Sequence, residues 1–184
     1  MSLWKRAALI AKRLGYHHEL NLNRELYFPS STSLGNQSWK PPNTVVLARN
    51  PEGEIVGAET YLFKDVADTF VAEARACERA LILAVALGFR RIIVEGDSLT
   101  VIKSIKKKQN DKSILRPITQ YILSLETGFE EISYLFVPRI ANNTAHTLAM
   151  EGRRRHAFRV WSDGVPESVQ TSALKDWAAW NSRP

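Results

Sequence analysis

The sequence predicts a mixed α/β fold in which one β-sheet is flanked by helices. The first observation is the order of the predicted elements, which runs strand, strand, helix, strand, helix, helix, strand, helix. The second is the near-continuous apolar run Ile92-Ile93-Val94, which favours a strand buried on both faces. With 184 residues, of which 45% are hydrophobic, the chain is large enough for one core with extensions.

The N-terminal part of the chain is predicted to lie outside this sheet. Residues 3–15 fit a short basic amphipathic helix, because Leu3, Ala7, Ile10 and Leu14 lie near one stripe. Residues 16–43 are rich in Asn, Ser and Pro, which is typical of a linker. We therefore expect a basic helix and irregular linker over residues 1–38, the α/β domain over 39–156, and a tail with a short helix over 157–184.

A hairpin is predicted to open the α/β domain. Residues 44–49 are apolar and β-branched, residues 50–53 carry the turn signal Asn-Pro-Glu-Gly, and residues 54–62 form the partner strand. A long helix follows over residues 68–87, with Gly88 well placed to end it. The next strand covers residues 90–95.

The second half continues the alternation. Helices are expected over residues 98–106, which Ser98 caps, and over 113–126, with Pro117 in the first turn. A strand over residues 131–137 and a helix over 142–154 complete the domain. The tail over residues 161–180 contains a helix at roughly 167–180.

Charge and cysteine content narrow the function classes. The formal net charge of +6 and the pI of about 9.6 favour a polyanionic partner, although a soluble protein can also simply be basic. Cys77 is the only cysteine, which excludes an internal disulfide and a cysteine-based zinc site and fits a reducing compartment. No run is long enough to cross a membrane, and the N-terminal apolar stretch is too short for a secretory signal. We expect an intracellular protein, nuclear or cytoplasmic, with no membrane partner.

Glu73 and Asp97 are the first candidates for chemistry. Glu73 lies on the predicted helix over residues 68–87, and Asp97 follows the strand over 90–95. Carboxylates from a helix and from the end of a strand can converge on one hard cation, for which oxygen ligands are required. Each also has a simpler reading, because Glu73 can be a solvated helix residue and Asp97 a helix N-cap together with Ser98.

Short motifs in a fixed order resemble plant type 1 ribonuclease H-like domains, which are related to the ribonuclease H module of plant retroelements. The match covers about residues 39–180. The motifs are Trp39-Lys40-Pro41-Pro42, the hairpin Val45 to Ala58, Ala72-Glu73-Ala74-Arg75-Ala76, Val94 to Ile102, Val137 to Ala149, and the tail from Val160-Trp161 to Asp176-Trp177.

This resemblance implies a two-metal nuclease site. In the family, four acidic residues hold two Mg²⁺ ions, one of which activates water while the other stabilises the leaving oxygen of an RNA phosphodiester. By resemblance, Glu73 and Asp97 are catalytic metal ligands. The implied substrate is an RNA–DNA hybrid.

Two of the four ligands are not found. The family's first Asp lies on a central strand between the Trp-Lys-Pro-Pro segment and the strand beginning at Thr44, where this chain has only Asn43. The fourth position holds His146, a poorer ligand for Mg²⁺ that either assists as a general acid or base or lies on a helix surface. The expected fold is therefore a ribonuclease H-like sheet that lacks its first, central strand, with Mg²⁺ bound weakly or not at all.

The absent central strand leaves three outcomes open. Residues 25–28 can fill the vacant position, the two flanking strands can pair directly, or the chain is a truncated or misassembled product that folds poorly. For a compact structure we expect direct pairing. For the biology we favour the truncated product.

Basic residues indicate a nucleic-acid rim. They are Lys103, Lys106, Lys107, Lys108 and Arg139, and the neutral polar Asn142 joins them; Arg139 and Asn142 are predicted contacts to a backbone phosphate. A solvated helix face and a loop held in place are the simpler readings of the same residues. We expect a module that binds an RNA–DNA hybrid or a single strand with weak or no hydrolysis. The alternatives are an active hybrid endoribonuclease and a non-functional retroelement-derived product.

Overall fold

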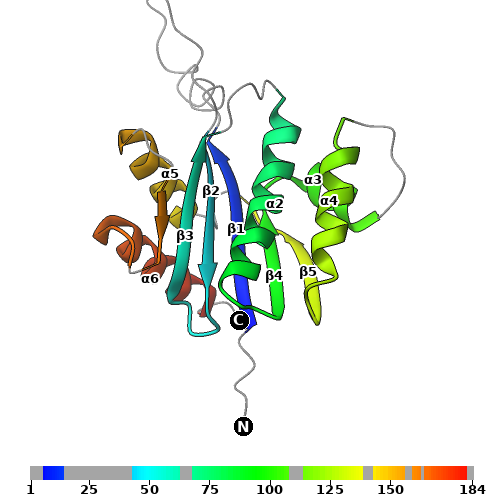
Figure 1. Cartoon of the computed structure of the whole chain (residues 1–184). Helices are drawn as coiled ribbons and strands as arrows, with labels where there is room; N and C mark the ends of the chain where they lie inside the picture. The colour runs from blue at the N-terminus through cyan, green and yellow to red at the C-terminus, as the bar shows by residue number, and fades with distance from the viewer. Residues whose placement is uncertain are drawn as a thin grey trace, which may run out of the picture.

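A computed structural model describes residues 6–14, 43–62, 68–107, 114–138, 143–155, 159–162 and 164–181. These residues form a six-stranded mixed sheet in the order β5-β4-β1-β2-β3-β6, with helices on both faces (Figure 1). The predicted α/β architecture, a mixed sheet flanked by helices, is thereby confirmed. Within the described ranges, no helix has both the length and the apolar character that a bilayer span requires.

The centre of the sheet is strand β1 (Arg6–Leu14). It pairs antiparallel with β2 (Asn43–Arg49) and parallel with β4 (Arg91–Gly96), so that Ala11 lies opposite both Val46 and Gly96. Three expectations are corrected by this pairing: the helix over residues 3–15, the absence of a central strand, and direct pairing of the flanking strands. Residues 25–28, the other candidate for this position, lie outside the described residues.

The physical reason for the error is the length of the apolar run. Residues 7–11 are Ala-Ala-Leu-Ile-Ala. This short apolar run is compatible with the apolar face of a helix and also with a strand that is buried on both faces. Between two partner strands, this segment gains a ladder on each side, which an isolated short helix at the chain end does not have. Tertiary pairing therefore decides the conformation.

The predicted hairpin is confirmed to within one residue. Strand β3 (Ile55–Leu62) pairs antiparallel with β2, and Gly53 N–H donates to the Asn50 carbonyl across 3.0 Å to close the turn. Gly53 has a φ of 81°, a left-handed conformation that glycine adopts without strain. The Trp177 ring packs against Gly53 so closely that a Cβ there would lie 2.4 Å from it.

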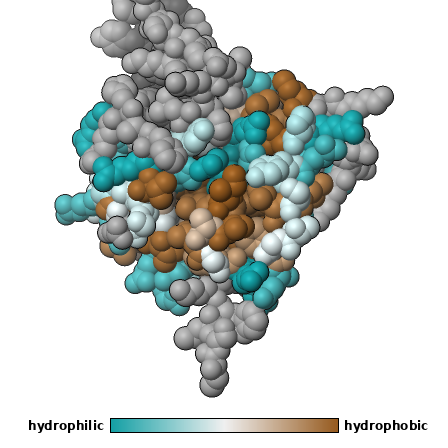
Figure 2. All heavy atoms as spheres, viewed as in Figure 1, coloured by the Kyte–Doolittle hydropathy of each residue, from teal (hydrophilic) through white to brown (hydrophobic). Residues whose placement is uncertain are grey.

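Helix α2 (Thr69–Ala86) crosses one face of the sheet. The sequence predicts this helix over residues 68–87. Asp68 caps it by accepting hydrogen bonds from Phe70 N and Val71 N at 2.6 and 3.2 Å. Gly88 ends the helix with a φ of 74°. On the outer side of α2, Phe70 and Val85 are about half exposed, and Figure 2 shows apolar side chains gathered over the middle of this face.

Helices α3 (Leu99–Lys107) and α4 (Arg116–Glu126) lie beside α2, and edge strand β5 (Glu131–Phe136) extends the sheet next to β4. Pro117 is in the first turn of α4, as the sequence predicts. The core on this face joins side chains from α2, α3, α4, β2, β4 and β5. Its largest fully buried members are Val46, Leu81, Ile92, Val94, Ile105 and Ile122.

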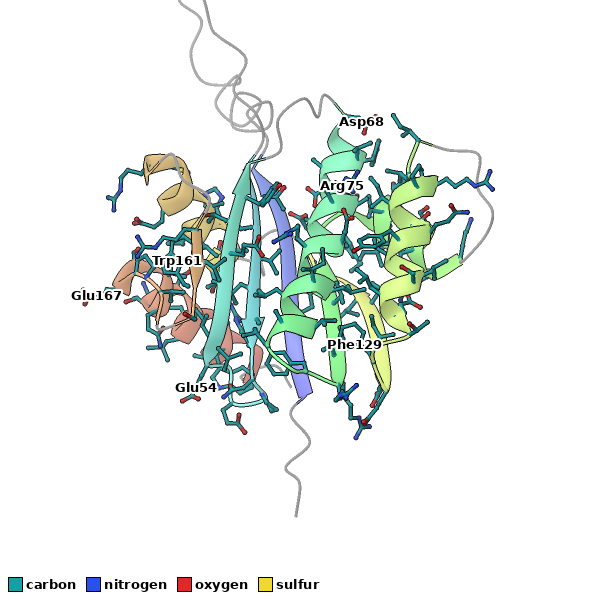
Figure 3. The ribbon with its side chains drawn as sticks, viewed as in Figure 1. Glu54, Asp68, Arg75, Phe129, Trp161 and Glu167 are labelled. Atoms are coloured by element: carbon teal, nitrogen blue, oxygen red, sulfur yellow. The ribbon has the colours of Figure 1, made fainter. Side chains whose placement is uncertain are left out.

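A second core covers the opposite face. It is built by α5 (Asn143–Arg155), the short strand β6 (Arg159–Trp161) and α6 (Glu167–Asn181), which pack against β2 and β3. The sequence predicts α5 and α6 but not β6, which pairs with β3 and places Trp161 in the core (Figure 3). Residues 159–181 thus share the sheet with the rest of the molecule. The domain boundaries at 38/39 and 156/157 stay predictions about which segments fold independently.

We predict that Ala8→Pro destabilises the protein strongly, because both edges of β1 are paired. Loss of one ladder hydrogen bond in a buried strand costs on the order of 1–3 kcal/mol, before any steric effect of the ring. Urea unfolding followed by circular dichroism measures the change, with Ala8→Ser as the control. Equal midpoints for the two variants would show that residues 6–14 are not a central strand.

We also predict that Trp161→Ala lowers the free energy of unfolding by about 3–5 kcal/mol, because its side chain fills the second core. The adjacent Val160, which is 49% exposed, provides a matched control on the same strand. Val160→Ala is expected to cost less than about 1 kcal/mol. Similar losses for both variants would mean that β6 does not contribute to the core.

Candidate functional site

Glu73 is held on the second turn of α2 by a row of small residues. Ala72, Ala74 and Ala76 are fully buried, so the helix backbone lies close to the neighbouring elements. Glu73 itself is half-buried. A carboxylate at this position is fixed by a rigid helix and still accessible.

Asp97 lies at the carboxyl end of β4, directly before α3. It is half-buried. Ser98, rather than Asp97, caps α3, because its Oγ accepts a hydrogen bond from Val101 N at 3.4 Å and its carbonyl accepts one from Ile102 N at 3.0 Å. The cap role that the sequence left open for the pair is thus filled by Ser98.

The thiol of Cys77 shows that the two carboxylates share one neighbourhood. Cys77 follows Glu73 by one helical turn and is only 2% exposed, as expected for a small buried hydrophobe. Burial raises the pKa of the Cys77 thiol most, and the negative charges of Glu73 and Asp97 raise that pKa further. Both carboxylates therefore act on the same buried sulfur, one from α2 and one from the end of β4.

His146 lies in the first half of α5 and is half-buried. The start of this helix is held by a residue from α6. The Oδ2 atom of Asp176 accepts hydrogen bonds from Thr144 N at 2.9 Å and from Thr144 Oγ1 at 2.6 Å. A carboxylate at a helix N-terminus also complements the helix dipole, so Asp176 fixes the helix that carries His146.

Arg49 joins this cluster from β2. Its Nη2 lies 3.5 Å from Asp176 Oδ2, and both side chains are nearly buried. Burial lowers the pKa of Arg49, while the charges of Asp176 and Glu95 oppose that shift. Glu95 lies on the face of β4 opposite Val94 and Gly96, as the alternation predicts, and burial raises its pKa while Arg49 lowers it.

The donors that the described residues supply do not fit a pair of magnesium ions. Among the described residues, no three His, Cys, Asp or Glu side chains gather closely enough to hold a metal. Strand β1 occupies the central position, and its nine residues include no Asp or Glu. Asp176, the acidic residue nearest the start of α5, is already bonded to Thr144 and Arg49.

A family model described as reverse transcriptase-like matches residues 35–152, which is more than half of the chain. The chain belongs to the reverse transcriptase-like family. The matched span begins after β1, so the strand that fills the centre of the sheet lies outside it. No curated protein matched the sequence.

Solved ribonuclease H structures resemble this reverse transcriptase-like protein. Ribonuclease H1 of the halophilic archaeon Halobacterium salinarum is 25% identical with a TM-score of 0.62, covering 82% of this chain and 98% of its own. The N-terminal ribonuclease H domain of a Mycobacterium tuberculosis protein is 18% identical with a TM-score of 0.58, covering 97% of this chain and 99% of its own. LC11-RNase H1, solved with an RNA/DNA hybrid, is 15% identical with a TM-score of 0.60, covering 82% of this chain and 98% of its own. The chain thus has a ribonuclease H-like domain related to RNA–DNA hybrid ribonucleases.

The basic residues predicted from the sequence fall into two groups. Lys103, Lys106 and Lys107 are exposed on α3, the helix that begins two residues after Asp97. Lys106 and Lys107 occupy its last turn, where cations complement the helix dipole. Lys108, Arg139 and Asn142 lie outside the described residues.

Sequence reasoning missed the buried polar groups that fix the site. Asp176 and Arg49 meet only because α6 folds back over β2, and nothing in their spacing of 127 residues signals the contact. The same is true of Glu59, which is 2% exposed and forms an ion pair with Arg79, whose guanidinium lies 5.0 Å from the centre of the Tyr61 ring. The sequence signal for the second pair was a single charged residue, Glu59, inside a strand with no other charge.

We predict that Glu95 makes stability depend on pH. Because burial raises its folded pKa above the usual 4.5, the folded state binds this proton more tightly than the unfolded state. The Glu95 contribution is therefore fully present below about pH 4.5 and is lost as pH rises through the folded pKa. Urea unfolding between pH 4 and 7 should show wild type losing stability relative to Glu95→Gln as pH rises. Glu52→Gln, in the exposed β2–β3 turn, is the charge-matched control, and a constant difference for Glu95→Gln would contradict the prediction.

Proposed function

We propose that this protein is a nucleic-acid-binding ribonuclease H-like domain in which hydrolysis is weak or lost. The observation that carries the proposal is the sequence of β1. The strand at the centre of the sheet has three cations, Arg6, Lys12 and Arg13, and no carboxylate. Its Ala11 is paired with Gly96, the residue before Asp97.

Charge explains why two carboxylates do not support a two-metal reaction. Two divalent cations beside Glu73 and Asp97 leave roughly two positive charges uncompensated, and β1 contributes no Asp or Glu to offset them. Glu73 and Asp97 could hold one Mg²⁺ weakly, with water completing its coordination. No hydrolytic step follows from this donor set.

Binding rests on charge and on the relatives. The three exposed lysines on α3 extend away from Asp97, and the chain carries a formal net charge of +6. Such a surface attracts phosphates without reading sequence. LC11-RNase H1 and a foamy viral protease-reverse transcriptase were both solved with an RNA/DNA hybrid, which supports a hybrid as the ligand here. Single-stranded nucleic acid is the other ligand that this surface suits.

There are two alternatives to this proposal. An active endoribonuclease would use Glu73 and Asp97 as metal ligands with His146 assisting, and both carboxylates act on the thiol of Cys77. The second alternative is a truncated, non-functional retroelement-derived product. An intracellular location, nuclear or cytoplasmic, fits the nucleic-acid role.

Hybrid binding without cleavage is the expected result. With a labelled RNA–DNA hybrid and Mg²⁺ or Mn²⁺, we expect salt-dependent binding and no turnover at ordinary enzyme rates. Glu73→Ala should leave binding nearly unchanged, whereas Lys103→Glu combined with Lys107→Glu should weaken it by at least about tenfold. Multiple-turnover cleavage that Glu73→Ala abolishes would establish the enzyme instead.

A variant that adds a carboxylate ligand provides a second test of the metal site. His146→Asp adds a carboxylate at the position where the resemblance places the fourth ligand. Mg²⁺ titration calorimetry should show tighter binding to this variant than to wild type, because a neutral donor is replaced by an anion. His146→Asn, which adds no charge, is the control. Equal affinity for all three proteins would show that His146 lies away from the metal position.

A further inference from the structure

Strand β5 is a long free edge of the sheet (Figure 1). The other edge, β6, has three residues, whereas β5 has six and pairs with β4 without a bulge from Glu131 to Phe136. Folded proteins usually protect such edges with lysine, proline, a bulge or a covering segment. The sequence of β5 contains neither Lys nor Pro. In the described part of the chain, no strand pairs with β5 on its outer side.

The main chain of β5 presents hydrogen-bonding groups along this edge. Glu131 N donates to the Arg90 carbonyl at 3.3 Å, and Val137 N donates to the Gly96 carbonyl at 3.0 Å. Alternate residues of a parallel strand bond to the same neighbour, so the odd-numbered residues of β5 bond to β4. The N–H and C=O groups of Ile132, Tyr134 and Phe136 therefore point outward.

A small recess lies beside the middle of this edge. It has a volume of about 240 Å³ and is lined by Lys106 of α3, Glu126 of α4, and Ile132, Ser133 and Tyr134 of β5. Tyr134 OH donates to Glu126 Oε1 at 2.9 Å, so this carboxylate already has a partner. The recess suits one side chain. Its lining carries one cation, Lys106, and one carboxylate, Glu126, so Lys106 is the group in it that can pair with an anion.

We propose that β5 binds an extended acidic peptide segment of another protein, which adds to the sheet as a further strand. Main-chain hydrogen bonds to Ile132, Tyr134 and Phe136 would give affinity, and a carboxylate in the recess beside Lys106 would give specificity. Apolar side chains of the segment would cover Leu135 and Phe136, which are 40% and 38% exposed. The acidic segment and a nucleic acid would both use the exposed lysines of α3, so each is expected to compete with the other.

Charge selects this occupant over a second copy of the chain. Lys103, Lys106 and Lys107 are exposed on α3 next to β5, and the chain has a formal net charge of +6. Two copies joined along β5 would bring these lysines together, whereas an acidic segment neutralises them. A nucleic acid also neutralises the lysines, but it leaves the outward amides and the apolar pair Leu135 and Phe136 without matching groups.

The test uses a capped synthetic peptide of about ten residues that alternates glutamate and valine. Titrated into isotope-labelled full-length protein, it should shift the amide resonances of Ile132, Tyr134 and Phe136. The same peptide N-methylated at alternate residues, in both registers, should bind in one register and lose binding in the other. Shifts confined to other elements, or no binding at millimolar peptide, would overturn the proposal.

Charge-reversal variants complete the experiment. Lys106→Glu should weaken peptide binding by about tenfold, while Lys175→Glu, an equal change at an exposed position on α6, should leave it unchanged. Thermal unfolding of both variants checks that the fold is intact. Equal affinity for both variants overturns the recess assignment. If a single-stranded oligonucleotide shifts the β5 amides and the peptide does not, the edge belongs to the nucleic-acid surface and the proposal fails.

Discussion

The two-sided pairing of β1 is the constraint on which the rest of the structure depends. Without it, β2 and β4 would each have an open edge in the middle of the molecule, and neither core could form over a continuous sheet. With it, α2 packs across β1 and β2 on one face, while α5 packs on the other. The parallel register with β4 also places Gly96 opposite Ala11, and it thereby fixes where Asp97, the next residue, lies along β1.

The same strand determines what the site contains. A ribonuclease H-like domain places its central strand beside the end of β4, so whatever residues fill that strand become neighbours of Asp97. The nine residues of β1 include no Asp or Glu. Backbone pairing requires only residues that form strands, so a central strand can pair without any carboxylate. Binding of Mg²⁺, in contrast, requires oxygen ligands such as carboxylates.

The C-terminal segment stabilises the opposite face through one buried carboxylate. Asp176 bonds to Thr144 at the start of α5 and lies against Arg49 on β2, so α6, α5 and the sheet meet at one point. A buried charge without partners would be very unfavourable, so the three elements must assemble together. Trp161 and Trp177 add apolar contacts to β3 and to the β2–β3 turn. This coupling explains how the C-terminal tail becomes part of the core.

The sequence by itself determined the α/β class, the hairpin, and helices α2 to α6, because each of these elements carries local signals. The signals are apolar periodicity, residues that cap helices, such as Asp68 and Ser98, and glycines at positions where the structure has a positive φ. It also identified Glu73 and Asp97 as a pair worth examining. Only the tertiary structure decided that residues 6–14 are a strand, since their short apolar run fits either conformation until two neighbours bond to it. It likewise decided the contacts of Asp176, Arg49 and Glu59, because pairing between residues far apart in the chain leaves no local pattern.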